Sequence, residues 1–259
     1  MTNWGFKLTN ITANWSIQGN NILEAVNLDF QIQDASTAAL PLMGPSGQGK
    51  STLLYLLAAL KLPTTGTISW RFPNDSKIYV WGEQAHTAID TVKLRREHFG
   101  FAFQASTLSA YLTVNENIAY PLLLQGKTWH EALEIAEQIF NDVLLPYEQT
   151  ERKALLKRFP SELSGGQRQR AALAQAIVHN PQVLFADEPT GQLDLHTRKQ
   201  VMGVLKTWLQ AGGGQRCLIW VTHHHLNDLE LMDINQLLFV QEKTCVYRDK
   251  QWLAEWINH

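Results

Sequence analysis

Residues 44–52 have the composition of a loop that binds phosphate groups. Their sequence, GPSGQGKST, fits the pattern G-x-x-x-x-G-K-[ST]. Glycines allow the backbone N–H groups to wrap around phosphates, the lysine reaches the β- and γ-phosphates, and the following hydroxyl coordinates Mg²⁺. A turn that needed only a flexible backbone would require the glycines but not Lys50. The pattern therefore predicts a nucleotide site made of Gly44, Pro45, Ser46, Gly47, Gln48, Gly49, Lys50, Ser51 and Thr52.

Two adjacent carboxylates, Asp187 and Glu188, follow a short apolar run at residues 183–186. Such a run is typical of a strand that is buried on both faces. When a phosphoryl group is transferred to water, one carboxylate can hold the metal ion while another orients or deprotonates the water. We therefore predict that Asp187 binds Mg²⁺ and that Glu188 acts on the water. Adjacent acids can also be solvated turn residues, but the phosphate loop favours the catalytic interpretation.

A second glycine-rich element, Ser164-Gly165-Gly166-Gln167, precedes a helical run. It lacks the lysine and hydroxyl pair, so it is not a second phosphate loop. Two conformationally free glycines at the start of a helix leave backbone N–H groups bare and available to an anion. Ser164 could instead be only an N-cap, with the glycines forming a turn. The two other motifs favour the anion-binding interpretation.

Predicted strands and helices alternate along the chain, which indicates a mainly parallel, doubly wound α/β core. Pro41 is unusual in a central strand, so the strand before the phosphate loop is either irregular or shorter than its apolar run. The predicted strands are 25–32, 37–43, 66–70, 78–81, 99–103, 183–186 and 217–221. The predicted helices are 51–60, 167–178 and 197–209, with an interrupted helical pattern at 114–145.

Length, charge and cysteine content limit the class of protein. The chain has 259 residues and a formal net charge of −2, which argues against a nucleic-acid partner. Its two cysteines lack metal-type spacing, so a reducing compartment is expected and a disulfide framework is not. No signal peptide is expected, and the longest apolar run, residues 53–60, is too short to cross a bilayer. Any membrane-spanning part is therefore expected on another chain.

Together these motifs resemble those of the ABC ATPases, and the resemblance covers nearly the whole chain. Residues 163–174 and 183–194 are its most specific stretches. Residues 94–101, 115–122 and 187–194 are most similar to the subgroup that contains the lipoprotein-releasing, macrolide-exporting and cell-division ATPases. Two positions depart from the family pattern: Gln175 stands where arginine is common, and His224 where aspartate is usual.

The resemblance implies roles for further residues. Gln104 corresponds to the Q-loop glutamine, which contacts Mg²⁺ or the water and links the nucleotide site to a membrane partner. His223 resembles the switch histidine that hydrogen-bonds the γ-phosphate, and Asp194 resembles the aspartate of the D-loop. Trp15 lies where the family often has an aromatic residue that stacks on adenine, although it could also be a core tryptophan. The implied residues are catalytic Glu188, His223 and Gln104, metal-binding Ser51, Gln104 and Asp187, and nucleotide-binding Trp15, Ser164, Gly165, Gly166, Gln167 and Asp194, in addition to the phosphate loop.

The resemblance also implies an architecture and an assembly. The fold would be a P-loop NTPase (RecA-like) core with a mainly parallel sheet, an N-terminal antiparallel β subdomain and an inserted α-helical subdomain. Residues 1–259 would form one ATPase domain: the β subdomain and first part of the core at 1–103, the helical subdomain at 104–166, and the second part of the core at 167–259. Two ATPase subunits, expected to be a homodimer, would enclose two ATP molecules with Mg²⁺.

The implied function is ATP hydrolysis that energises a separately encoded integral membrane permease subunit through closure of the dimer. The chain would bind peripherally at the cytoplasmic face of a bacterial inner membrane. One alternative is a soluble ABC-type ATPase acting on ribosomes or DNA, and another is a mechanotransmitting ATPase that moves no substrate across the membrane. A third is a regulatory module that closes on ATP without hydrolysing it, against which Glu188 and His223 argue.

Overall fold

The computed structural model describes residues 4–16, 19–34, 37–82, 89–103, 107–143, 146–191, 193–223 and 225–258. Its strands are β1 (Trp4–Ala13), β2 (Leu23–Ile32), β3 (Ala39–Met43), β4 (Thr65–Arg71), β5 (Ile78–Gly82), β6 (Phe99–Phe103), β7 (Val183–Asp187), β8 (Cys217–Val221), β9 (Gln236–Gln241) and β10 (Thr244–Asp249). Its helices are α1 (Lys50–Leu57), α2 (Thr91–His98), α3 (Val114–Leu124), α4 (Trp129–Val143), α5 (Arg152–Lys157), α6 (Gly165–Ile177), α7 (Leu195–Ala211), α8 (His225–Met232) and α9 (Lys250–Ile257), with 3-10 helices η1 (Pro146–Glu151) and η2 (Pro160–Glu162). Across these ranges, no helix is both long and apolar enough to cross a bilayer.

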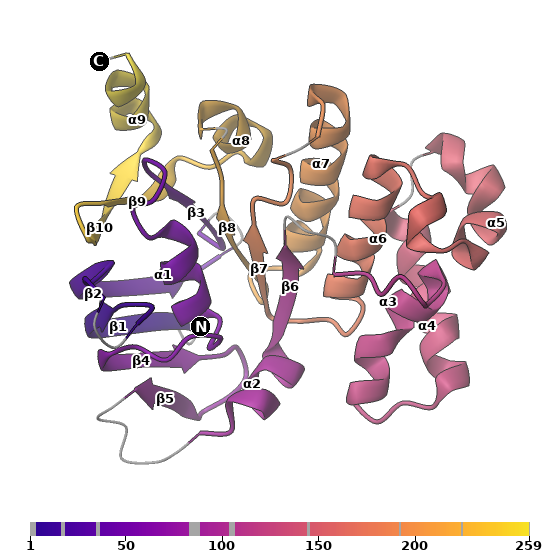
Figure 1. Ribbon diagram of the computed structural model, residues 1–259, viewed down its shortest axis with the longest axis horizontal. Helices are drawn as coiled ribbons and strands as arrows, with labels where there is room; N and C mark the ends of the chain where they lie inside the picture. The colour runs from indigo at the N-terminus through magenta and orange to yellow at the C-terminus, as the bar shows by residue number, and fades with distance from the viewer. Residues whose placement is uncertain are drawn as a thin grey trace.

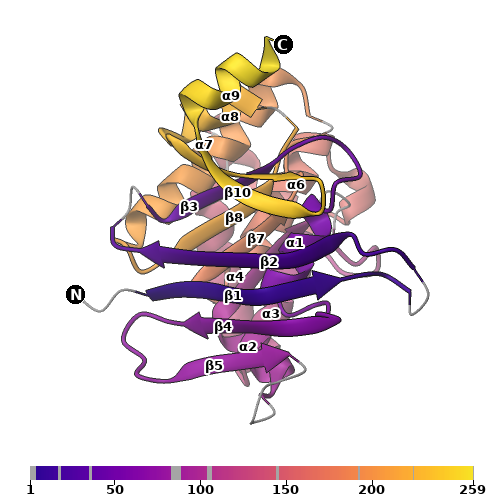
Figure 2. The same ribbon diagram turned by 90° about the vertical axis from the view of Figure 1, so that its left-hand side faces the viewer.

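Two sheets organise the fold (Figures 1 and 2). The first is antiparallel, with the strand order β2-β1-β4-β5, and Figure 2 shows it across the front of the molecule. The second has the order β10-β9-β3-β8-β7-β6, and its strands are parallel from β9 to β6, with β10 antiparallel to β9. The structure therefore confirms the predicted α/β class, with a mainly parallel sheet and an antiparallel β subdomain.

Helix α1 lies between the two sheets. It contacts β3, β7 and β8 of the parallel sheet, and its Leu57 carbonyl accepts a 2.9 Å hydrogen bond from the indole N–H of Trp70 in the antiparallel sheet. Leu53, Leu54 and Leu56 of this helix are fully buried. Hydrophobic burial against both sheets therefore fixes the helix that follows the phosphate loop.

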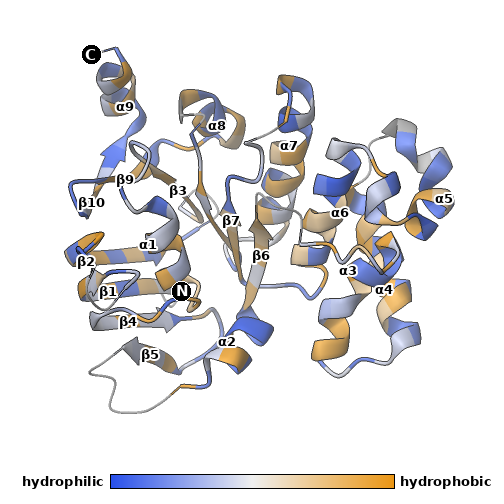
Figure 3. Cartoon of the chain, in the orientation of Figure 1, coloured by the Kyte–Doolittle hydropathy of each residue, from blue (hydrophilic) through white to orange (hydrophobic). Residues whose placement is uncertain are grey.

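Helices cover the remaining faces of the core. Helix α7 packs against β8 and α8, whereas α6 contacts β6 and also α3 and α4. Figure 3 shows apolar residues concentrated in the central strands and in stripes along these helices. In Figure 1, α3, α4 and α5 lie together beside α6, on the side of the molecule away from the antiparallel sheet.

Pro41 lies within β3, which is shorter than its apolar run. The strand begins at Ala39, and Pro41 is paired with Trp220 of β8. On its other side, β3 pairs with β9 through Leu42 and Met43. Proline has no N–H to donate to a neighbouring strand. Because Pro41 lies just before the residues that pair with β9, the sheet loses little hydrogen bonding there. The strand is therefore two residues shorter than predicted, although it still contains Pro41.

Several element boundaries differ from their predicted positions. Helix α6 begins at Gly165 rather than at Gln167, so the glycines form its first turn. Helix α7 begins at Leu195, directly after the N-cap Asp194. Strands β1, β9 and β10 had no predicted counterpart. Strands β1 and β10 mix buried apolar and exposed polar residues, and β1 pairs with β2 and β4 on either side. Strand β9 has four consecutive buried apolar residues, a pattern that could have been predicted from the sequence.

Candidate nucleotide site

The predicted site residues follow strands that are adjacent in the parallel sheet. Leu42 of β3 is level with Val221 of β8, Val221 with Asp187 of β7, and Asp187 with Phe103 of β6. These four residues form one row at the carboxyl ends of the strands. The phosphate loop, the acidic pair and His223 therefore emerge at the same edge, which is where open α/β sheets bind ligands.

Lys50 is buried beneath its own loop. Its ammonium donates hydrogen bonds of 2.8 Å to the carbonyl oxygens of both Gly44 and Pro45, and the residue is 5% exposed. Burial lowers the pKa of Lys50, while the carboxylates of Glu188 and Asp187 act in the opposite direction. The loop thus places a cation below the space that its backbone encloses, facing two anionic side chains.

The conformation of the loop depends on Gly44. This residue has a φ of 135°, and a Cβ added to it would lie 2.1 Å from the carbonyl oxygen of Val240 in β9. Only glycine permits this close approach. At the other end of the loop, Gly49 occupies the N-cap of α1 and has no side chain to cap the helix. The side-chain oxygen of Gln48 accepts a 3.0 Å hydrogen bond from the Glu242 N–H, which ties the loop to the β9–β10 turn.

Ser51 and Asp187 lie in direct contact although 136 positions separate them in the sequence. The Ser51 hydroxyl donates to Oδ1 of Asp187 at 3.0 Å, and the Tyr55 hydroxyl donates to Oδ2 at 2.9 Å. Burial, with the Asp187 hydrogen bond as the next cause, raises the pKa of Tyr55 to about 12. Tyr55 therefore remains a hydrogen-bond donor at neutral pH. The oxygen donors of Ser51 and Asp187 fit Mg²⁺, which prefers oxygen ligands.

The side chains of Glu188 and His223 are in direct contact at the strand ends. Nε2 of His223 lies 2.7 Å from Oε1 of Glu188. Glu188 has a φ of 49°, in the left-handed region that residues other than glycine rarely adopt. Its N–H donates to the Val221 carbonyl at 3.1 Å, so pairing with β8 holds it in this conformation. Strained conformations of this kind cluster at functional sites.

Trp15 lies on the surface beside the start of α1. Its indole N–H donates to the Thr52 hydroxyl at 3.0 Å, and its ring stands edge-on to Tyr55 at 6.2 Å between centroids. The Lys61 ammonium lies 4.5 Å from the ring centroid. With 59% of its surface exposed, Trp15 is not a core residue. An exposed ring held by contacts with three residues of the adjoining helix and loop is suited to stacking against a planar ligand.

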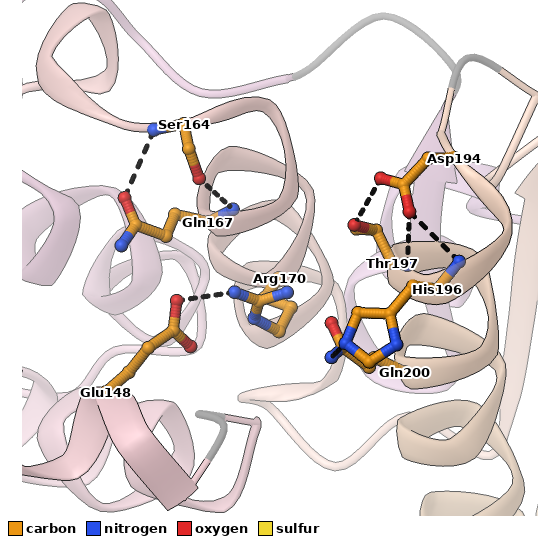
Figure 4. Close-up of polar contacts among 8 residues, drawn as sticks. All are labelled: Glu148, Ser164, Gln167, Arg170, Asp194, His196, Thr197 and Gln200. Carbon is orange, nitrogen blue, oxygen red and sulfur yellow. Dashed lines mark hydrogen bonds and ion pairs between the residues drawn. The ribbon is translucent and has the colours of Figure 1, made fainter.

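Ser164 and Gln167 form a capping box at the start of α6 (Figure 4). The Gln167 N–H donates to Oγ of Ser164 at 3.2 Å, and the Ser164 N–H donates to the Gln167 side-chain oxygen at 3.1 Å. Gly165 and Gly166 lie between them, and N–H groups in the first turn of a helix have no acceptor within the helix. Ser164 and Gly165 are exposed. Both predicted roles are therefore compatible: Ser164 is an N-cap, and the two glycines present free N–H groups.

The N-termini of α6 and α7 lie side by side, as Figure 4 shows. A Cβ added to Gly166 would lie 2.8 Å from the Thr197 methyl group, so glycine is needed for this close approach. Asp194 caps α7: its carboxylate accepts from the N–H groups of His196 at 2.9 Å and Thr197 at 3.1 Å, and from the Thr197 hydroxyl at 2.6 Å. These hydrogen bonds lower the pKa of Asp194, the one from the Thr197 side chain most strongly.

The glycine-rich element at residues 164–167, which resembles the signature motif of the ABC ATPases, lies apart from the phosphate loop of the same chain. Figure 1 shows β7 and β8 between α1, which follows the phosphate loop, and α6, which begins with the signature glycines. The structure thus brings together Lys50, Ser51, Asp187, Glu188 and His223, and it places Ser164, Gly165, Gly166 and Asp194 as a second group. Gln104, predicted to be catalytic and metal-binding, and His224 lie outside the described residues.

Gln175, the departure from the family pattern in α6, bridges two segments. Its side-chain N–H donates to the Asn117 carbonyl of α3 at 2.8 Å, and its oxygen accepts from the Thr107 hydroxyl at 2.8 Å. Thr107 follows the segment that contains Gln104. The uncharged amide, which can both donate and accept, is suited to this position.

Sequence reasoning missed three polar residues next to the site. Tyr55 could have been found, because it follows Ser51 by four positions and so lies on the same face of the helix. Arg198 and Asp228 form a buried ion pair, with Nη2 2.6 Å and Nε 3.0 Å from Oδ1 of Asp228, and Asp228 also accepts from the Thr222 hydroxyl. They belong to different helices, and no local pattern signals their contact.

Comparisons with known proteins agree with this geometry. Residues 25–191 match the family model described as "ABC transporter". The chain is 36% identical over 200 residues to the lipoprotein-releasing system ATP-binding protein LolD of Wigglesworthia glossinidia brevipalpis, covering 77% of this chain and 80% of that protein. It is 31% identical over 250 residues to LolD of Idiomarina loihiensis, covering 96% of this chain and all of that protein (100%).

The fold also matches solved structures of an ABC transporter cassette. The dimeric structure of MJ0796, described as a bacterial ABC transporter cassette, matches with a TM-score of 0.75 and 28% identity, covering 95% of this chain and 99% of that chain. A post-hydrolysis state of the same cassette, bound to ADP and Pi, matches with a TM-score of 0.76. With a matched family model over most of its length and relatives above 30% identity, the chain belongs to the ABC transporter family, in which it is an ATP-hydrolysing cassette.

Proposed function

We propose that this protein is the ATPase subunit of an ABC transporter complex and energises a separate integral membrane subunit. Two copies would close on two ATP–Mg²⁺ molecules, and hydrolysis would reopen them. The observation that carries the proposal is the convergence of Lys50, Ser51, Asp187, Glu188 and His223 at one edge of the sheet. The protein would act at the cytoplasmic face of the membrane.

Each residue at this edge has a chemical role in the proposed reaction. Lys50 would exchange its loop carbonyls for the β- and γ-phosphate oxygens, which are stronger acceptors. Ser51 and Asp187 would hold Mg²⁺, whose charge neutralises the phosphates. Glu188 would orient or deprotonate the attacking water, and His223, which already touches it, would donate a hydrogen bond to the γ-phosphate. Gln104 would contact the metal ion or the water.

The second group of residues would act on the partner copy. The free N–H groups of Gly165 and Gly166 would bind the γ-phosphate held by the opposite phosphate loop, with Ser164 and Gln167 fixing the helix terminus. Asp194 would hold the adjoining α7 terminus in place. The separation of α1 from α6 within one chain supports this shared site (Figure 1). Trp15 would stack on the adenine.

A cavity of about 460 Å³ offers a docking position for the membrane subunit. It is lined by residues of α2, β6, α3 and α6 and is bordered by Thr107, just after the segment that contains Gln104. Val92 and Leu124 at its edge are 62% and 54% exposed. Arg95 and Arg96 add positive charge to this apolar lining. An apolar segment of the permease, bearing an acidic residue, would fit this surface.

The test is a pull-down of the Glu188→Gln variant from detergent-solubilised membranes of its source, with and without ATP. The substitution keeps the size of the side chain and removes its basicity, so the closed ATP-bound state should accumulate. Recovery of an integral membrane protein, identified by mass spectrometry, is the expected result. Glu255→Gln, the same change on α9, is the matched control. Recovery of only soluble proteins, in both nucleotide conditions, would favour the soluble ATPase alternative.

A further inference from the structure

The phenol of Tyr55 and the hydroxyl of Ser51 hold the two oxygens of one carboxylate. Both residues lie on α1, four positions apart, so their side chains project from the same face of the helix. Ser51 donates to Oδ1 of Asp187 at 3.0 Å, and Tyr55 donates to Oδ2 at 2.9 Å. The orientation of the Asp187 carboxylate is therefore set by α1 rather than by β7 alone.

The Tyr55 ring is itself fixed by two aromatic neighbours. Trp15 lies 6.2 Å from it at an interplanar angle of 86°, and Phe103 lies 6.3 Å away at 69°. Edge-to-face contacts of this kind favour one ring orientation. Phe103 ends β6 and is level with Asp187 in the sheet. The hydroxyl thus approaches the carboxylate from a ring that is held on both sides.

We propose that Tyr55 is a positioning residue for the Mg²⁺ that accompanies ATP. By occupying Oδ2, its hydroxyl keeps Oδ1 turned toward Ser51, so that the two predicted metal-binding oxygens face the same point. A carboxylate without this bond could rotate about its terminal torsion, which has a broad energy minimum. Neighbours that hydrogen-bond a metal ligand in this way commonly set the affinity of the metal site. The inference rests on the proposed assignment of Ser51 and Asp187 to Mg²⁺.

The test measures how nucleotide binding by the full-length protein depends on Mg²⁺. A fluorescent, non-hydrolysable ATP analogue is held at fixed concentration while Mg²⁺ is titrated, and the midpoint is compared among variants. Tyr55→Phe removes the hydroxyl and keeps the ring, so its contacts with Trp15 and Phe103 remain. The expected result is a midpoint raised about tenfold. Analogue binding in excess EDTA should match that of the unmodified protein. The melting temperature without nucleotide should fall by no more than a few degrees, because one hydrogen bond is lost.

The matched control is Tyr79→Phe. The Tyr79 hydroxyl also donates to a carboxylate oxygen, Oδ2 of Asp75 at 3.0 Å, but in the antiparallel sheet. Its Mg²⁺ midpoint should not change. An unchanged midpoint in Tyr55→Phe, or an equal loss of binding with and without Mg²⁺, would overturn the inference.

A third variant separates this inference from the function on which it rests. Asp187→Asn should abolish the Mg²⁺ dependence of analogue binding if Asp187 holds the metal ion. If that dependence survives in Asp187→Asn, the proposed metal assignment fails. If Asp187→Asn loses the Mg²⁺ dependence while Tyr55→Phe keeps the Mg²⁺ midpoint of the unmodified protein, only the proposed role of Tyr55 is wrong.

Discussion

At the residue scale, each charged group of the site has a hydrogen-bond partner within the chain. The Lys50 ammonium is satisfied by two loop carbonyls, Asp187 by two hydroxyls and Glu188 by an imidazole. Buried polar groups are costly unless they are paired, and each of these contacts offsets that cost. In the proposed function, a bound nucleotide would replace these contacts by stronger ones with phosphate oxygens and Mg²⁺.

Replacing Lys50 by alanine should weaken ATP binding. A charge-assisted hydrogen bond to phosphate contributes about 1.5–3 kcal/mol, which corresponds to a loss of about ten- to a hundredfold in affinity. Fluorescence titration of a nucleotide analogue measures this loss. Lys93→Ala, which removes an exposed lysine of α2 paired with Glu97, should leave the affinity unchanged. An affinity of Lys50→Ala equal to that of the unmodified protein would count against the phosphate-loop assignment.

Glu188→Gln should retain ATP binding while hydrolysis falls by about a hundredfold or more, because a general base is lost. The amide can still accept a hydrogen bond from His223, so the loop conformation should survive. Single-turnover hydrolysis of bound ATP separates the chemical step from binding and release. Turnover close to that of the unmodified protein would show that another group acts on the water.

At the element scale, a buried ion pair joins helix α7 to α8, and an exposed ion pair joins α7 to the turn that follows α8. Arg198 and Asp228 form the buried pair, and Asp228 also accepts from Thr222, the residue before His223. Lys206 and Asp233 form the second pair, in which the Asp233 side chain is 76% exposed. The buried pair thus connects the helix that Asp194 caps with the loop that carries His223.

Asp228→Ala should destabilise the fold by about 3–5 kcal/mol, because it leaves Arg198 as an uncompensated buried charge. Asp233→Ala breaks the exposed pair between α7 and the turn after α8 and should cost less than about 1 kcal/mol. Urea unfolding of both variants gives the two free energies. Equal losses in the free energy of unfolding would show that the buried pair stabilises the fold no more than the exposed pair does.

At the scale of the whole molecule, the proposed shared site would require a second copy. The phosphate loop lies on one side of the central strands and the signature turn on the other (Figure 1). Closed two-fold assemblies pair the same surface of both chains, so each copy would complete the other's site. The similarity to a dimeric cassette structure agrees with this arrangement.

Ser164→Arg should abolish ATP-dependent dimerisation without changing the ATP affinity of one chain, because the added side chain would fill the space for the partner's nucleotide. The experiment uses the Glu188→Gln background and measures mass by light scattering after size-exclusion chromatography. Thr128→Arg is the matched control, since Thr128 forms the same type of capping box with Glu131 at the start of α4. A dimer of Ser164→Arg at saturating ATP–Mg²⁺ would contradict the shared site.

The sequence by itself determined the local chemistry: the phosphate loop, the acidic pair after a buried strand and the glycines at a helix start. Each depends on neighbouring residues, whose backbone freedom and polarity are readable along the chain. Tertiary structure decided which of them meet. The register of β7 and β8 places Asp187 level with Val221, and that of β3 and β8 places Leu42 there as well, so Ser51 reaches a carboxylate 136 positions away. The Tyr55 bond and the Arg198–Asp228 pair also arise from packing between distant elements, which local patterns do not encode.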